Sequence, residues 1–325
     1  NTINEKLFVG PEQYDRLNIY GRILVDEARR RGIAVELIDS ENGYFRLTHG
    51  GRSITCRESL SELTSAVAMS RCDDKRVTRK LLTEAGLRMP EQILVGDERE
   101  LQAFVERHGR VVVKPARGEQ GRGVSVDLRD MAEVKAAIEA ARRYSDDVLV
   151  EELVEGEDLR IIVIDHQVVA AAIRKPAEVT GDGESDLRTL IAKQSRRREA
   201  ATSGESSIPL DDETERCVRA AGWRMDDVLP AGQTLAVRKT ANLHTGGTIH
   251  DVTANLHPKL AEVATQASRA LDIPVVGLDL MVPDVGGTEY AIIEANERPG
   301  LANHEPQPTA DRFVDLLFPQ TRTEA

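Results

Sequence analysis

The residue types best suited to chemistry stand in three clusters. The first is an apolar, strand-like run over residues 111–115 that carries Lys114 and is followed by Gly118, Gly121 and Gly123. Glycines let backbone N–H groups approach an anion, and a lysine adds positive charge for phosphate oxygens. A plain glycine-rich hairpin explains the same pattern. A P-loop or a Rossmann fold is disfavoured, because no helix follows the loop directly.

The second cluster is acidic and covers residues 150–160, where a strand is expected to end and a turn at Gly156 leads into another strand near Arg160. An extended linker between two lobes exposes backbone groups that can pair with adenine. A nearby carboxylate can hold ribose hydroxyls. An acidic surface turn is the alternative interpretation.

The third cluster is the most specific, because it places charged groups on two apolar, strand-like runs. Asp279 lies in the run 277–281, and Glu294 and Asn296 lie in the run 291–296. A gap of one residue puts the side chains of Glu294 and Asn296 on the same face of a strand. Hard oxygen donors of this kind suit Mg²⁺, and a carboxylate on a buried strand needs a partner. A hydrogen-bonded structural carboxylate is the alternative.

Composition limits the class of protein that carries these clusters. With 325 residues, of which 40% are hydrophobic and 30% charged, we expect two or three lobes that enclose a cleft. No apolar run reaches the roughly 18 residues that cross a bilayer, which excludes a membrane span. A net charge of −12 argues against a nucleic-acid partner. The cysteines are odd in number and far apart in the sequence, at Cys56, Cys72 and Cys217. This pattern predicts structural thiols in a reducing cytoplasm.

The periodicity of apolar residues predicts an α/β alternation that positions the clusters. A carboxylate at residue 73 or 74 can cap a helix that carries Lys75 and ends before Gly86. Other helices are predicted over residues 14–31, 60–69, 98–107 and 131–144, with strands over 33–39, 44–48, 53–57, 92–95, 111–114, 124–127 and 148–153. A polar insertion follows at about residues 181–232, and its charged tract 195–199 is interpreted as a solvated loop.

With the three clusters in this order, the chain resembles the ATP-grasp superfamily over about residues 47–304. The motifs SELTSAVA (61–68), DKRVT (74–78), LLTEAG (81–86), TGDG (180–183) and ANLHTGG (241–247) resemble those of the ATP-grasp module of cyanophycin synthetase. The module fused to bacterial glutamate–cysteine ligase, which makes glutathione, is similar too. So is N-acetylglutaminylglutamine synthetase, which we favour. Its ATP-grasp part follows another domain, which would explain a fragment of a multidomain enzyme that begins at Asn1.

The resemblance implies an α+β ATP-grasp fold in three parts. They are a small pre-ATP-grasp-like segment over residues 1–72, a small lobe with a glycine-rich lid over 73–154, and a large lobe over 155–318 that carries the metal site and the insertion. Related ligases commonly form dimers or tetramers, so a homo-oligomer is an expectation as well.

The resemblance also implies a role for each matching residue. The ATP site would comprise Lys75 and Lys114 on the phosphates, Gly118, Gly121 and Gly123 in the lid, Glu151 and Val154 at adenine, and Asp158 at ribose. The catalytic arginines would be Arg160 and Arg238, the ligands of Mg²⁺ or Mn²⁺ would be Asp279, Glu294 and Asn296, and the substrate side would comprise Arg174, Asn242, Gly246 and Gly247. Glu297 and Arg298 depart from the cyanophycin-type motif, which indicates a changed substrate pocket. Lys239 has no assigned role, and His304 is a further candidate for substrate contact.

The implied reaction joins a small carboxylate to an amine through an acyl phosphate, at the expense of ATP. Such chemistry depends on positioning and charge neutralisation, and needs no side-chain nucleophile. Two rivals stay open: a module that binds ATP as a sensor, and a small-molecule kinase of the same fold.

Overall fold

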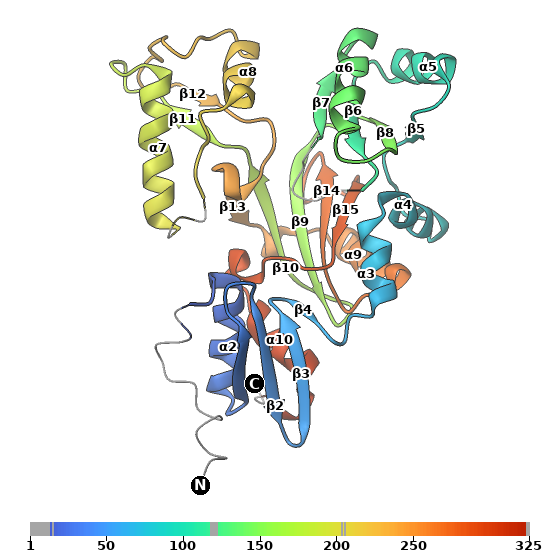
Figure 1. Cartoon of the computed structure of the whole chain (residues 1–325), viewed down its shortest axis with the longest axis vertical. Coiled ribbons are helices and arrows are strands. Elements are labelled where there is room, and N and C mark those ends of the chain that lie inside the picture. Colours follow the sequence, from blue (N-terminus) through green and yellow to red (C-terminus); the bar gives the residue numbers. More distant parts are fainter. Residues whose placement is uncertain (1–13, 15, 118–122, 203, 205, 323–325) are drawn as a thin grey trace. The chain divides into compact units, whose positions relative to one another are not determined.

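The contacts of the chain divide it into two compact units. Their helices and strands are labelled in Figure 1. The computed structural model describes residues 14, 16–117, 123–202, 204 and 206–322. Unit 1 contains Asn1–Ala171 and Val252–Ala325, and unit 2 contains Ala172–Asp251. The predicted α+β class is confirmed, since both units combine helices with antiparallel strands. The predicted division into three parts stays a prediction, although the insertion 181–232 lies inside unit 2.

The first sheet of unit 1 is an antiparallel meander. Its strands, in order, are β1 (Ala34–Asp39), β2 (Tyr44–His49), β3 (Arg52–Arg57) and β4 (Leu60–Ser61). Gly50 and Gly51 close the predicted hairpin with φ of 57° and 81°, which a two-residue turn of this kind requires. The expected helix over residues 60–69 is wrong in its first half. Ser61 pairs with Cys56, and the helix α3 (Ala66–Asp73) begins only after Ser65, whose side chain caps it.

Two helices cover this sheet, and a buried arginine joins them. Helix α2 (Ile19–Arg30) and helix α10 (Thr309–Leu317) share a core with Phe45 of β2. The side chain of Arg31 is 2% exposed and makes ion pairs of 2.6 Å with Glu27, Asp311 and Asp315. The pairs satisfy the buried guanidinium and link the C-terminal end of α2 to α10.

Replacing Arg31 by methionine is therefore expected to lower the free energy of unfolding by about 3–5 kcal/mol, because carboxylates lose a buried counter-ion. Urea denaturation measures the change. Arg46→Met is the matched control, since Arg46 and its partner Glu36 are 43% and 57% exposed, and the expected loss is below about 1 kcal/mol. Equal losses in the two variants would contradict the structural role of Arg31.

The second sheet of unit 1 presents the first predicted cluster. Its strands, in order, are β5 (Gln92–Leu94), β8 (Val148–Glu152), β6 (Val111–Pro115) and β7 (Ser125–Leu128). Helices α5 (Glu98–His108) and α6 (Met131–Ala141) pack on one face, where Val111 and Val113 meet Phe104 and Ile138. Because side chains alternate along a strand, this packing directs Lys114 to the opposite face.

The third sheet carries the third cluster and the end of the second, which begins on β8. Its unit 1 strands are β9 (Glu157–Ile164), β14 (Val275–Val282) and β15 (Ala291–Asn296), and β10 (Gln167–Lys175) continues from β9 into unit 2. Helices α3 and α4 (Lys75–Glu84) contact β15, and α9 (Pro258–Leu271) contacts β9 and β14. The short turns η2 (Thr253–Asn255), η3 (Leu301–His304) and η4 (Pro319–Thr321) complete the unit.

Unit 2 has its own small core. Its elements are α7 (Leu187–Ala201), α8 (Asp212–Ala220), the pair β11 (Glu178–Thr180) and β12 (Thr234–Ala236), β13 (Thr248–Asp251) beside the end of β10, and the turn η1 (Leu243–Thr245). The interpretation of residues 195–199 as a loop is wrong, since they belong to α7. Ser195 is buried there, and its hydroxyl accepts the backbone N–H of Ile208 at 2.9 Å. This contact ties the tract to the core.

Two observations bear on the predictions from composition. Cys56, Cys72 and Cys217 are free and buried, and burial raises the pKa of the Cys72 thiol to about 12, helped by the charge of Glu297. A thiol of this kind is a poor nucleophile at neutral pH. Among the residues that the structure describes, no helix is long and apolar enough to cross a membrane.

Candidate active site

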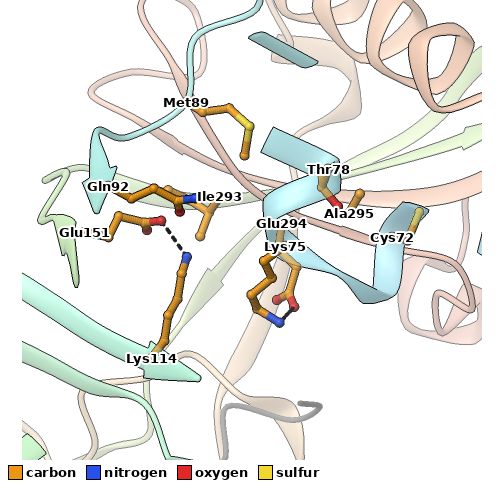
Figure 2. Close-up of a pocket in the computed structure, with 10 residues that line it drawn as sticks. All are labelled: Cys72, Lys75, Thr78, Met89, Gln92, Lys114, Glu151, Ile293, Glu294 and Ala295. Atoms are coloured by element: carbon orange, nitrogen blue, oxygen red, sulfur yellow. Dashed lines mark ion pairs between the residues drawn. The ribbon is translucent and has the colours of Figure 1, made fainter. Parts of the chain in front are cut away.

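Two lysines from separate elements of unit 1 line one pocket (Figure 2). Lys75 is the first residue of α4, and Lys114 lies on β6. The pocket is lined by Cys72, Lys75, Thr78, Met89, Gln92, Lys114, Glu151, Ile293, Glu294 and Ala295. Figure 2 shows that each ammonium group points to a carboxylate within the pocket. The pocket thus combines two ion pairs with a lining that is partly apolar.

Lys114 and Glu151 form the more deeply buried of the two ion pairs. Their side chains are 7% and 5% exposed, and the Lys114 Nζ lies 2.6 Å from the Glu151 Oε2. The pair spans neighbouring strands, because β6 is hydrogen-bonded to β8 in a register that places Val112 opposite Glu151. A lysine this buried needs a counter-charge. Glu151 supplies it and lies beside Gln92 of β5.

The acidic residues of the third cluster belong to a row that crosses three strands. Arg160 of β9 faces Asp279 of β14, and Asp279 faces Glu294 of β15. The Arg160 guanidinium donates to both carboxylate oxygens of Asp279, from Nη2 to Oδ2 at 3.0 Å and from Nε to Oδ1. At the other end of the row, the Lys75 Nζ lies 3.1 Å from the Glu294 Oε1. Each carboxylate of the row therefore has a cation beside it.

Asn296 contacts this row where Gly277, which has no side chain, leaves room for it. Gly277 lies opposite Asn296, and a Cβ added to it would come within 2.8 Å of Pro299 and 3.1 Å of the Arg160 guanidinium. The Asn296 amide nitrogen donates to the Gly277 carbonyl at 3.3 Å and to the Asp279 carboxylate at 3.4 Å. The register between β14 and β15 shifts directly after Asp279. Such β-bulges often lie beside functional sites.

The predicted adenine and ribose positions lie where β8 passes into β9. Val154 is in the connection, and Asp158 lies two residues before Arg160 on β9, so the two side chains leave the same face of the strand. Gly156 in this connection has a φ of 148°, and a Cβ there would approach the Val282 carbonyl oxygen to 2.5 Å. Only glycine fits this close passage of two backbones.

The remaining predicted residues of unit 2 make local contacts. The side chain of Arg238 is 10% exposed, and its Nη1 donates to Asp211 at 2.6 Å and to the Thr214 hydroxyl at 3.1 Å. Arg174 lies on β10 opposite Ile249. The Asn242 side chain caps the turn η1 by accepting the His244 N–H at 2.9 Å.

The glycine pair after this turn has a packing reason. A Cβ on Gly246 would meet Ile208 at 2.4 Å, and one on Gly247 would meet the Asn242 carbonyl oxygen at 2.8 Å. Their proposed roles toward substrate stay predictions.

The lid glycines and His304 are the remaining candidates, and the pocket also contains residues that were not predicted. Gly118 and Gly121 lie outside the described residues, whereas Gly123 is described, with a φ of 72°. Sequence reasoning missed the other residues that line the pocket, namely Cys72, Thr78, Met89, Gln92, Ile293 and Ala295. No sequence signal marks these uncharged residues, because only packing brings them to the pocket. His304 is buried in η3 at 4% exposure.

Comparisons with known proteins identify a domain family and longer relatives. Residues 72–195 match the model of the RimK-like ATP-grasp domain. A cyanophycin synthetase of Trichormus variabilis is 30% identical over 315 residues, which are 92% of this chain and 35% of that protein. The glutathione biosynthesis bifunctional protein GshAB of Mannheimia succiniciproducens is 26% identical, over 91% of this chain and 41% of that protein. The chain thus spans well under half the length of these relatives.

Two solved structures share the fold. A bifunctional glutathione synthetase from Pasteurella multocida aligns with a TM-score of 0.68 at 22% identity, over 95% of this chain and 44% of that one. A D-alanine–D-alanine ligase from Bacillus anthracis aligns with a TM-score of 0.51 at 15% identity, over 79% of this chain and 70% of that one. The α+β architecture of this chain is therefore that of known ligase structures.

Proposed function

Because the chain carries a RimK-like ATP-grasp domain, we propose that it is an ATP-dependent, ADP-forming carboxylate–amine ligase. One observation carries the proposal: Lys75 and Lys114 share a pocket, and Lys75 also ends the row formed by Arg160, Asp279 and Glu294. The two lysines provide positive charge for a triphosphate, and the row provides oxygen donors beside it.

The donor set fits a divalent cation of the hard kind. Asp279, Glu294 and Asn296 come from neighbouring strands, and the Asn296 amide nitrogen is engaged by Gly277 and Asp279, which leaves its oxygen as the donor atom. Carboxylate and amide oxygens are the ligands that Mg²⁺ and Mn²⁺ prefer. These three side chains would hold the cation, whose charge would offset that of the nucleotide phosphates.

The reaction balances as two displacements. A carboxylate oxygen of the acid attacks the γ-phosphorus of ATP, the bond to the β-phosphate oxygen breaks, and ADP leaves. The amine nitrogen then attacks the acyl carbon, inorganic phosphate leaves, and the amine loses a proton. Lys75 and Lys114 bind and orient phosphate oxygens. Arg160, which is held by Asp279, stabilises the charge that develops during phosphoryl transfer.

Two other functions are compatible with the fold; an observation weighs against the first, and an experiment distinguishes the second. A module that only senses ATP has no need of an arginine aligned with the metal donors, as Arg160 is. A kinase transfers phosphate to a small molecule and stops there, so its phosphate release does not depend on an amine. Phosphate release that requires both an acid and an amine would therefore distinguish the ligase from the sensor and the kinase.

The experiment incubates the protein with ATP, Mg²⁺ and pairs of amino-acid-derived acids and amines, and measures ADP, phosphate and products by mass spectrometry. Glutamine, N-acetylglutamine, glutamate, aspartate and cysteine derivatives form the panel. Formation of N-acetylglutaminylglutamine is our finer proposal for the product. Tight ATP binding without turnover of any pair would identify the sensor, and a stable phosphorylated acid formed without amine would identify the kinase.

The ion pair between Lys75 and Glu294 makes a prediction about the cation. A metal held by Glu294 would compete with Lys75 for the same carboxylate. Lys75→Met is therefore expected to raise the affinity for Mn²⁺ about fivefold in the absence of nucleotide, which corresponds to about 1 kcal/mol for a part-exposed ion pair. Paramagnetic resonance of free Mn²⁺ measures it. Lys80→Met, at an exposed position of the same helix, is the control. An unchanged or lower affinity in the Lys75 variant would refute the shared use of Glu294.

A further inference from the structure

Asp74 lies at the junction between the two elements that carry the lysines. Its side chain is 9% exposed and accepts the Arg76 backbone N–H at 3.0 Å, which caps helix α4 one residue before Lys75. The same carboxylate accepts the Arg117 Nη2 at 3.1 Å, and Arg117 follows the end of β6, the strand of Lys114. One carboxylate thus contacts both the start of the helix and the end of the strand.

Further contacts close this junction into a ring. The Lys75 backbone N–H donates to the Ala116 carbonyl at 3.4 Å, and the Ala116 N–H donates to the Asp147 carbonyl at 2.9 Å. The Arg76 guanidinium spans the ring, with its Nη1 donating to Asp147 at 2.7 Å and its Nη2 to Asp74 at 3.0 Å. The start of α4, the end of β6 and the start of β8 are therefore tied together at one point.

From this ring we propose that Asp74 is a positioning residue, which holds Lys75 and Lys114 at the separation that a triphosphate needs. The inference rests on the proposed function. Asp74 has no place at the reacting atoms, and it acts through the two elements that it joins. Long lysine side chains are flexible, so the placement of their backbones decides where the ammonium groups can reach.

An ordinary helix cap does not explain these contacts. Asp97 caps α5 by accepting the N–H groups of Arg99 and Glu100, and no ion pair of its carboxylate is found in the described part of the chain. Asp74 adds two arginines to its cap. The hydrogen bonds from Arg76, and then the charge of Arg117, lower the pKa of Asp74 to about 2, so the carboxylate stays charged at every pH at which the enzyme would work.

The test separates the cap from the charge. Asparagine caps helices as well as aspartate does, so Asp74→Asn keeps the cap and removes the charge from Arg76 and Arg117. Dissociation constants are measured by calorimetry for ATP and for adenosine, which has no phosphate. We expect Asp74→Asn to weaken ATP about tenfold and to change adenosine binding less than twofold. Asp97→Asn, the matched cap variant, should change neither.

Arg117→Ala supplies an independent arm, because Arg117 is 61% exposed and its loss leaves the cap of α4 intact. If Arg117 acts through Asp74, the double variant weakens ATP no more than Asp74→Asn alone. Unchanged ATP binding by the single variants, or equal losses for ATP and adenosine, would overturn the inference. So would no ATP binding by the wild type, which also removes the proposed function. Binding of ATP without any ligation would remove the proposed function alone.

Discussion

Exchange of Lys114 for methionine is expected to abolish ATP binding and to lower the free energy of unfolding by about 3–5 kcal/mol. The nucleotide loses a phosphate contact, and Glu151 loses the counter-ion that stabilises its charge at 5% exposure. Removing one member of a buried pair leaves an uncompensated charge, which costs more than the pair contributes. Calorimetric titration with ATP and urea denaturation measure the two effects separately.

A second substitution separates the two consequences of losing Lys114. Adding Glu151→Gln removes the unpaired charge, so the double variant is expected to regain most of its stability but no ATP binding. Lys135→Met is the control, because Lys135 and its partner Glu98 are 57% and 71% exposed, and we expect a loss below about 1 kcal/mol. Normal ATP affinity in the Lys114 variant would remove this lysine from the site.

Asn296→Ala is expected to reduce substrate-dependent ADP release at least 100-fold, roughly the upper limit for residues that only surround a metal site. In contrast to Lys114, this change should leave the fold intact. The hydrogen bonds from the Asn296 side chain are long, at 3.3 and 3.4 Å, and each is worth at most about 1 kcal/mol. Coupled-enzyme detection of ADP and thermal unfolding provide the readouts.

Asn42→Ala is the matched control for this prediction, because Asn42 is an exposed asparagine whose side chain bonds Asp39 at 2.7 Å. It should leave ADP release unchanged. Excess Mn²⁺ is expected to restore part of the Asn296 variant's activity, since a weakened site fills at higher metal concentration. Wild-type rates in the Asn296 variant would argue that Asp279 and Glu294 suffice.

The pairing of cations with acidic donors gives the site a simple electrostatic logic. Lys114 and Lys75 in the pocket and Arg160 in the row each have a carboxylate partner, so strong local charges are present without a large net charge. Under the proposed function, a nucleotide with its metal would bring both signs at once and replace these internal partners. Arg238 of unit 2 follows the same pattern, since Asp211 holds it at 2.6 Å.

Much of this protein could be predicted from local sequence. The helix that carries Lys75 follows from a capping carboxylate and a terminal glycine, and the hairpin at Gly50 and Gly51 follows from its turn residues. The strands of Lys114 and Asp279 stand out as apolar runs that contain a single charge. Interactions over a few residues decide such features, so the sequence alone predicts them.

Other features depended on partners far away in the chain. Residues 60–61 form a strand because they pair with the edge of β3. Residues 195–199 belong to α7, where the Ser195 hydroxyl accepts the backbone N–H of the distant Ile208. Local sequence does not predict the buried ion pair between Lys114 and Glu151. It does not predict the ring of contacts that joins Asp74 to Arg117 either. Burial and ion pairing arise when distant segments meet, and only the folded chain decides which carboxylate each cation receives.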